Sequence, residues 1–257
     1  MDQLNYARSF DRIKGIMDEL RDKCPWDKKQ TIASLRQLTI EEMYELVDAI
    51  TNEDWKGVQE ELGDLLLHIV FYAKIAQEQK QFDLGDVIEQ VCNKLVFRHP
   101  HIYSFTKVQN EEDVKRNWEK LKLKEGKKSV LSGVPLSLPA MTKALRLQEK
   151  AKQVGFEWKV LSDVKLKIEE ELQELDEVVQ SNDQEAMEAE FGDVLFSMIN
   201  YARYLNIDPE NALERTNKKF KSRFMQMEAQ LTEDGKGLNE FTLQEMDQVW
   251  NEIKKNE

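Results

Sequence analysis

The sequence has few residues that break helices and few that form cross-links. Of its 257 residues, 10 are glycine, 5 are proline and 2 are cysteine. The scarcity of glycine and proline leaves little chain for turns, and this composition favours long helices. Cys24 and Cys92 belong to no CxxC pair, which predicts reduced thiols, as in a cytoplasmic protein.

Basic charge and long apolar runs are also scarce. The 49 acidic residues outnumber the 37 basic ones and give a net charge of −12, so a broad basic face for nucleic acid is not expected. The first residues, MDQLNYARSFDRIKG, lack the apolar core of a signal peptide. No run of about 18 apolar residues occurs, so we expect no membrane-spanning segment.

Two acidic motifs recur in the second half of the chain in the same register. The stretch 41-EEMYE-45 recurs as 170-EELQE-174, and 61-ELGD-64 recurs as 190-EFGD-193. The interval from Glu45 to Glu61 equals the interval from Glu174 to Glu190. Small changes of register extend the match and pair Asp83 with Asp208, Lys94 with Lys219, Arg98 with Arg223 and Trp118 with Trp250. The chain is therefore predicted to be a tandem of two like modules.

The predicted fold is all-α, with two four-helix modules that form helical bundles. The modules are expected at 1–126 and 139–257, joined by a linker at 127–138 that is rich in Gly, Pro and Ser. Asp83 and Asp208 are expected to cap helices. The helices are predicted at 4–22, 34–52, 55–80, 84–98 and 111–124, and at 139–153, 162–181, 184–205, 209–231 and 242–255.

Acidic residues interrupt the apolar faces of two neighbouring predicted helices. At about 100° per residue, Glu42 falls inside the apolar arc of the first helix, and Glu45 lies at its rim. The second helix is apolar almost all round, which indicates burial, and Glu61 and Asp64 share one face of it. These four carboxylates, and their repeat counterparts, are predicted to converge.

Converging carboxylates need a compensating charge. Two like charges about 4 Å apart repel by roughly 4 kcal/mol at an effective dielectric near 20. Several such pairs exceed what a domain stable by about 5–15 kcal/mol tolerates, so some carboxyls take a proton or a cation binds. Oxygen ligands favour Mg2+ first and Mn2+ second, and magnesium at such a site predicts phosphate chemistry.

Two other interpretations of the carboxylates stay open. A single pair of Glu residues three apart is usually a solvated helix face, although repetition on apolar faces favours a site. A di-iron carboxylate bundle normally needs ExxH on facing helices. Here His68 lies one helical turn after Asp64, and its repeat counterpart is Ser197.

Basic and aromatic residues offer partners for a phosphorylated nucleoside. Lys94 and Arg98 lie four apart on one predicted helix, as do Lys219 and Arg223 on its counterpart. Arg can grip phosphate oxygens with two hydrogen bonds and Lys acts as a point charge, although a solvated basic face would look the same. Aromatic residues that could sandwich a base, or simply belong to the core, are Trp26, Phe156, Trp158, Trp118 and Trp250.

The two motif pairs resemble those of the MazG family of nucleoside triphosphate pyrophosphohydrolases, within the all-α NTP pyrophosphatase superfamily. The resemblance runs from about residue 8 to residue 257. Flanking stretches that resemble two-module bacterial MazG are 24-CPWDKKQT-31, 98-RHPH-101, 135-PLSLPAMTKALRLQEKA-151 and 155-GFEW-158.

The resemblance implies the reaction NTP + H2O → NMP + PPi on ribo- and deoxynucleoside triphosphates, in a house-cleaning or nucleotide-pool role. It implies Mg2+, with Mn2+ a possible substitute, and a homodimer whose partner chain helps to close the pocket. The implied metal ligands are Glu171, Glu174, Glu190 and Asp193, and likewise Glu42, Glu45, Glu61 and Asp64. Lys219 and Arg223 would hold phosphates and count with the second-module carboxylates as catalytic, while Lys167, Trp250, Asn200 and Trp158 are further candidates for substrate binding.

The two modules are predicted to differ in activity. Ser197 and Asn200 fall beside the second ExxD motif, where the first module has His68 and Phe71. A Phe near the metal face would make the first site drier, so the second module is expected to be the main catalyst. Ala186, four residues before Glu190, departs from the resemblance, because some related chains carry Lys at that position.

The residues leave the general base and the class of function open. Glu170 and Glu41 could act as bases through a second shell, but each points away from the ligand face. The alternative function is a noncatalytic helical protein that senses nucleotides or binds a partner. Intact acidic motifs and basic pairs favour the hydrolase.

Overall fold

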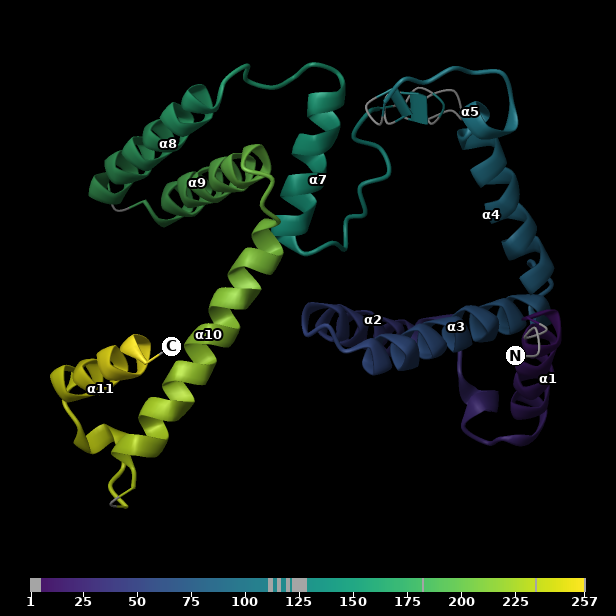
Figure 1. Cartoon of the computed structure of the whole chain (residues 1–257), viewed down its shortest axis with the longest axis horizontal. Helices are drawn as coiled ribbons and strands as arrows, with labels where there is room; N and C mark the ends of the chain where they lie inside the picture. Colours follow the sequence, from purple (N-terminus) through teal and green to yellow (C-terminus); the bar gives the residue numbers. More distant parts are fainter. Residues whose placement is uncertain are drawn as a thin grey trace. The chain divides into compact units, whose positions relative to one another are not determined.

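The structure is a computed structural model that describes residues 6–110, 113–114, 117–118, 121, 129–181, 183–233 and 235–256. Within these residues the secondary structure is helical and contains no strand. The chain divides into two compact units, Met1–Val114 and Lys115–Glu257 (Figure 1). The predicted all-α tandem fold is confirmed, whereas the bounds of the modules and linker stay predictions.

The first unit is built around a hairpin of two long helices. In Figure 1, α2 and α3 lie side by side, and α1 and α4 contact α3 toward its C-terminal end. The short turn between α2 and α3 allows only an antiparallel arrangement. Its helices are α1 (Tyr6–Lys23), α2 (Ile32–Thr51), α3 (Trp55–Glu78), α4 (Leu84–Arg98) and α5 (Pro100–Tyr103), with a 3-10 turn at Asp27–Lys29.

The second unit repeats the hairpin as α8 and α9. In Figure 1, α7 and the start of α10 lie at one end of this pair, and α11 packs on α10. The helices of this unit are α7 (Ala140–Gln153), α8 (Leu161–Ser181), α9 (Gln184–Tyr204), α10 (Pro209–Leu231) and α11 (Leu243–Lys255), with a 3-10 turn at Leu238–Glu240.

Most predicted helices agree closely with these bounds. The helix predicted at 111–124 lies largely outside the described residues. The predicted caps are confirmed: Asp83 accepts from the backbone N–H of Asp86 at 3.0 Å, and Asp208 accepts from that of Asn211 at 3.1 Å. The short helix α5 and the 3-10 turns were not predicted, because they are too short to show a helical period.

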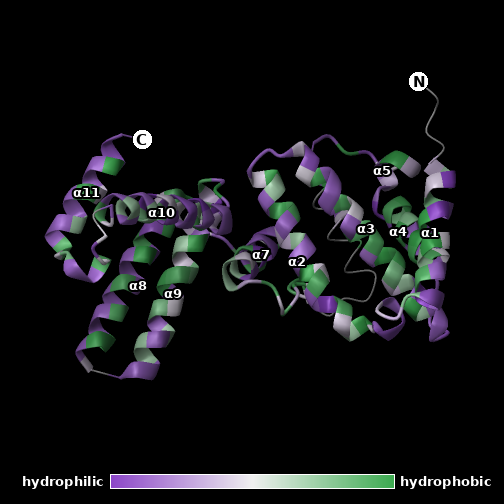
Figure 2. Ribbon diagram, turned by 90° about the horizontal axis from the view of Figure 1, so that it is seen from below, coloured by the Kyte–Doolittle hydropathy of each residue, from purple (hydrophilic) through white to green (hydrophobic). Residues whose placement is uncertain are grey.

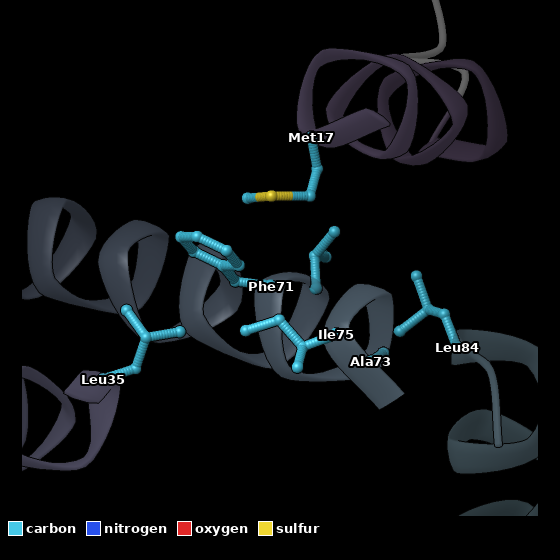
Figure 3. Close-up of a cluster of buried hydrophobic side chains, with 7 residues drawn as sticks. Met17, Leu35, Phe71, Ala73, Ile75 and Leu84 are labelled. Atoms are coloured by element: carbon cyan, nitrogen blue, oxygen red, sulfur yellow. The ribbon is translucent and has the colours of Figure 1, made fainter. Parts of the chain in front are cut away.

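Phe71, which the sequence placed beside the first ExxD motif, lies in the core of the first unit. Phe71 is 3% exposed and points from α3 toward Met17 of α1, with Leu35 of α2 and Leu84 of α4 in the same cluster (Figure 3). Phe71 therefore belongs to the apolar core that α3 forms with α1, α2 and α4. The helical wheel could not settle this, because an all-round apolar helix offers several faces for burial.

Arg21 holds α1 against the end of α3. Its Nε donates to Oε1 of Glu78 at 3.1 Å, and its Nη1 donates to the carbonyl oxygen of Gln30 at 3.1 Å. The hydrogen bond from Arg21, aided by its charge, lowers the pKa of the Glu78 carboxyl group. This ion pair therefore stabilises the first unit only while Glu78 is ionised.

Acid is expected to remove this contribution. Because the pKa of Glu78 is lower in the folded chain, the stabilisation is fully present above its ordinary pKa of 4.5 and is lost as pH falls through the folded pKa. Glu78→Gln should lower the thermal unfolding midpoint at neutral pH and match the parent in strong acid. Circular dichroism at both pH values checks this, with the exposed Glu19→Gln as control; an equal deficit at both values would contradict it.

Candidate functional site

The α2–α3 hairpin brings three of the four predicted carboxylates of the first module together. Ligand oxygens of Glu42, Glu45 and Glu61 all lie within 4.8 Å of one another. Asp54 caps α3 by accepting from the backbone N–H of Gly57 at 3.1 Å, which fixes the turn between the two helices. Glu42, Glu45 and Glu61 form the first carboxylate cluster.

This cluster is strongly acidic and partly dry. Burial, followed by the charges of Asp64 and Glu45, raises the pKa of the Glu42 carboxyl group. Burial, followed by the charge of Glu45 and a hydrogen bond with Glu42, raises the pKa of Glu61. Among the described residues, the buried Oε2 atom of Glu61 has no hydrogen-bond partner. A buried carboxylate oxygen without a partner is costly unless a proton or a cation meets it.

The α8–α9 hairpin forms the second carboxylate cluster. Oxygens of Glu171, Glu174 and Glu190 also lie within 4.8 Å of one another, and Glu171 is only 6% exposed. Nζ of Lys167 lies 2.8 Å from Oε1 of Glu171 and 2.8 Å from Oε1 of Glu170. Burial and a hydrogen bond with Glu171 raise the pKa of Glu174. This cluster therefore contains its own cation.

The aspartates of the two ExxD motifs lie at the margins of the clusters. Asp64 is half-buried, and its charge reaches Glu42, although it is not one of the three closest carboxylates. Asp193 is exposed on α9. Their roles as metal ligands stay predictions.

The basic and aromatic candidates at the end of the chain meet at the α10–α11 contact. The guanidinium carbon of Arg223 lies 6.0 Å from the ring centroid of Trp250, and the ring of Phe220 lies 5.3 Å from the same indole. Lys219 is exposed on α10. The structure thus brings Arg223 and Trp250 together, on helices other than those that carry the second carboxylate cluster.

Asn200 and Trp158 are held by two adjacent residues of α9, Arg203 and Tyr204, that the sequence did not reveal. Asn200 is 6% exposed, and its Oδ1 accepts from Nε and Nη2 of Arg203 at 3.1 and 2.9 Å. Nη1 of Arg203 also donates to Oε2 of Glu157 at 3.1 Å, and the hydroxyl of Tyr204 donates to the carbonyl of Trp158. A basic residue near the end of a buried helix was the signal that could have identified Arg203.

His68 is part of a buried network beside the first cluster. Its Nδ1 lies 2.7 Å from the hydroxyl of Thr39, which also lies 2.7 Å from the hydroxyl of Tyr72. Burial lowers the pKa of the His68 imidazole, while the charge of Asp64 opposes this shift. Thr39 therefore fixes the position of His68 through Nδ1, and burial makes the imidazole harder to protonate than a free one.

The fold and the two clusters define a class of protein. Each helical hairpin gathers carboxylate oxygens from both of its helices, and no other ligand type contributes to these groups in the described residues. Such oxygen sites suit a hard divalent cation that binds phosphate. The described helices include none that is both long and apolar enough to cross a membrane.

Comparison with known proteins places the chain in a family. The MazG nucleotide pyrophosphohydrolase domain matches residues 30–103 and 161–227, once on each carboxylate cluster. The chain belongs to the MazG family, and the resemblance seen in the sequence is confirmed.

Several relatives match over nearly the whole chain. A nucleoside triphosphate pyrophosphohydrolase of Escherichia coli K12 is 40% identical and covers 96% of this chain and 98% of its own length. A nucleoside triphosphate pyrophosphohydrolase/pyrophosphatase MazG of Thermotoga maritima is 42% identical, with 95% of each chain covered. Among solved structures, a MazG-related protein of Thermotoga maritima matches with a TM-score of 0.40 at 28% identity, over 44% of this chain and 98% of its own.

Proposed function

We propose that this protein is a Mg2+-dependent nucleoside triphosphate pyrophosphohydrolase that converts NTP and water to NMP and pyrophosphate. The observation that carries the proposal is the repeated carboxylate cluster on a helical hairpin. Relatives that share at least 40% identity over nearly the whole chain are named for this activity. Ribo- and deoxynucleoside triphosphates are the proposed substrates, with Mn2+ a possible substitute for Mg2+.

The residues present fit a hard divalent ion. Three carboxylates converge within 4.8 Å in each unit, and Glu61 has a buried oxygen that lacks a hydrogen-bond partner in the described structure. Glu171, Glu174 and Glu190 would hold the ion in the second unit, and Glu42, Glu45 and Glu61 in the first, with Asp193 and Asp64 as further ligands. When bound, the ion supplies positive charge to phosphate oxygens and activates the attacking water.

The second unit is proposed as the main catalytic site. Its cluster lies beside a cation, Lys167, that can reach a phosphate oxygen, whereas the first unit has Leu38 at the matching position. Lys219 and Arg223 would neutralise the leaving pyrophosphate, and Trp250 would contact the base. Asn200, buried and held by Arg203, and Trp158 would contribute to substrate binding.

A homodimer is proposed as the working form. Helices of both units expose large apolar side chains of a kind that monomers usually cover, and Figure 2 shows hydrophobic residues interleaved with hydrophilic ones along α8 and α9. The exposed apolar residues on α2, α3 and α9 include Met43, Tyr44, Val47, Ile50, Leu62, Ile69, Phe191, Leu195 and Met198. A partner chain over these surfaces would help to close the pocket.

The product distinguishes this activity from other hydrolyses. With Mg2+, the purified protein is expected to release pyrophosphate, and no orthophosphate, from ATP or dUTP. Removal of the metal by EDTA should abolish release, and added Mg2+ or Mn2+ should restore it, because the clusters lose the charge that neutralises the triphosphate. Ion chromatography of the products, with a nucleoside triphosphate panel, makes the measurement.

The second candidate function predicts a different result. A noncatalytic nucleotide-sensing or partner-binding protein would bind a Mg2+–nucleoside triphosphate and release neither product. Release of orthophosphate, or release that continues in EDTA, would contradict the proposed reaction.

A further inference from the structure

The two carboxylate clusters differ in one charge. Lys167 lies one helical turn before Glu171 on α8 and places its ammonium 2.8 Å from Oε1 of Glu171. The matching position on α2 in the repeat is Leu38, which packs against the apolar core. The second cluster thus holds three carboxylates and a built-in cation, whereas the first holds three carboxylates with an apolar neighbour.

This difference bears on when each cluster takes up a metal ion. A divalent cation entering the second cluster meets an ammonium that already neutralises Glu171 and is repelled by it. In the first cluster the position of Lys167 is taken by the apolar Leu38, and an oxygen of Glu61 is buried without a hydrogen-bond partner in the described structure. The first cluster should therefore bind a divalent ion more tightly in the free protein.

A triphosphate changes this balance at the second cluster. The Lys167 side chain is 31% exposed and has a flexible four-carbon stem, so its ammonium can leave Glu171 for an anionic partner. Phosphate oxygens can pair with the Lys167 ammonium in place of Glu171. The carboxylate of Glu171 is then able to bind the metal ion that accompanies the triphosphate. The same side chain would oppose metal binding before nucleotide arrives and support it afterwards.

We propose that Lys167 makes metal binding at the second carboxylate cluster depend on nucleotide, while the first cluster binds a divalent ion without nucleotide. Lys167 then acts as a positioning residue that keeps the second site from loading metal in the absence of substrate. This inference rests on the proposed function, since it assigns the carboxylate clusters to divalent metal.

Mn2+ binding to the full chain tests the proposal. Glu42→Gln with Glu61→Gln leaves only the second cluster, and Glu171→Gln with Glu190→Gln leaves only the first. Titration of Mn2+, followed by electron paramagnetic resonance of the free ion, gives the affinity of each cluster without nucleotide. Without nucleotide, the first cluster is expected to bind Mn2+ on the order of tenfold more tightly than the second cluster. The difference is no larger because solvent screens the repulsion between the partly exposed Lys167 ammonium and the metal ion.

Lys167→Met in the protein that keeps only the second cluster gives the decisive comparison. Without nucleotide, Mn2+ affinity should rise on the order of tenfold. With α,β-methylene-ATP, an analogue blocked at the scissile bond, Mn2+ affinity should fall. Lys165→Met, at an exposed position of the same helix, is the matched control and should change neither value. A purely structural role of Lys167 would not reverse sign with nucleotide.

The role proposed for Lys167 is wrong if, while Mn2+ still binds, Lys167→Met fails to raise the nucleotide-free affinity or fails to lower the affinity measured with the analogue. The metal site stands in either case. If Mn2+ binds neither cluster, even with the analogue, the proposed metal function itself fails. Leu38→Lys in the protein that keeps only the first cluster should weaken Mn2+ binding, with the unfolding midpoint checked because Leu38 packs against the core.

Discussion

Glu171→Gln is expected to reduce pyrophosphate release from a Mg2+–nucleoside triphosphate about 1000-fold. This corresponds to about 4 kcal/mol of lost transition-state stabilisation, the scale of one strong metal interaction. Glutamine keeps the shape of the side chain and removes its charge, at a position that is 6% exposed in the second carboxylate cluster. Lys167 keeps Glu170 as a partner at 2.8 Å, so the helix should remain folded.

Two variants serve as controls for this measurement. Glu169→Gln, on an exposed position of the same helix, should retain the parent kcat/KM. Glu42→Gln, the counterpart in the first cluster, should retain most of it, because the second unit is proposed as the main catalyst. If activity survived Glu171→Gln and was then lost on adding Glu42→Gln, the first unit, and not the second, would be the main catalyst.

Phe71→Ala is expected to destabilise the first unit by about 3–5 kcal/mol, the usual cost of truncating a buried Phe. The ring is 3% exposed and fills the space between α1, α2 and α3, so its removal leaves a cavity that the rigid helices can close only in part (Figure 3). Hydrogen exchange followed by mass spectrometry should show faster exchange in α1 and α3.

The faster exchange in Phe71→Ala should be confined to the first unit. Peptides from α8 and α9 should exchange as in the parent, because the second unit has its own packed helices. Phe105→Ala, at a side chain that is 99% exposed, should leave exchange unchanged throughout. If α1 exchanged as slowly in Phe71→Ala as in the parent, the role of Phe71 in the core would be wrong.

The sequence determined the helices and the repeat. Apolar residues spaced at the helical period, with Asp83 and Asp208 at the starts of two helices, set bounds that local hydrogen bonds enforce. Recurrence of the acidic motifs in the same register predicted that carboxylates on neighbouring helices converge, and the structure brings three of each four together. These features are local, or depend on a short turn that leaves only one arrangement of two helices.

Only the tertiary structure decided which faces of the helices meet. Helix α3 is apolar almost all round, so the sequence could not show that Phe71 turns to the core while Glu61 turns to the cluster. Arg203 was missed because its partner Glu157, which is distant in sequence, reaches it only after α9 packs against the 155–158 loop. Rotation of a helix about its axis is set by what packs against it, and no residue pattern within a single helix records that partner.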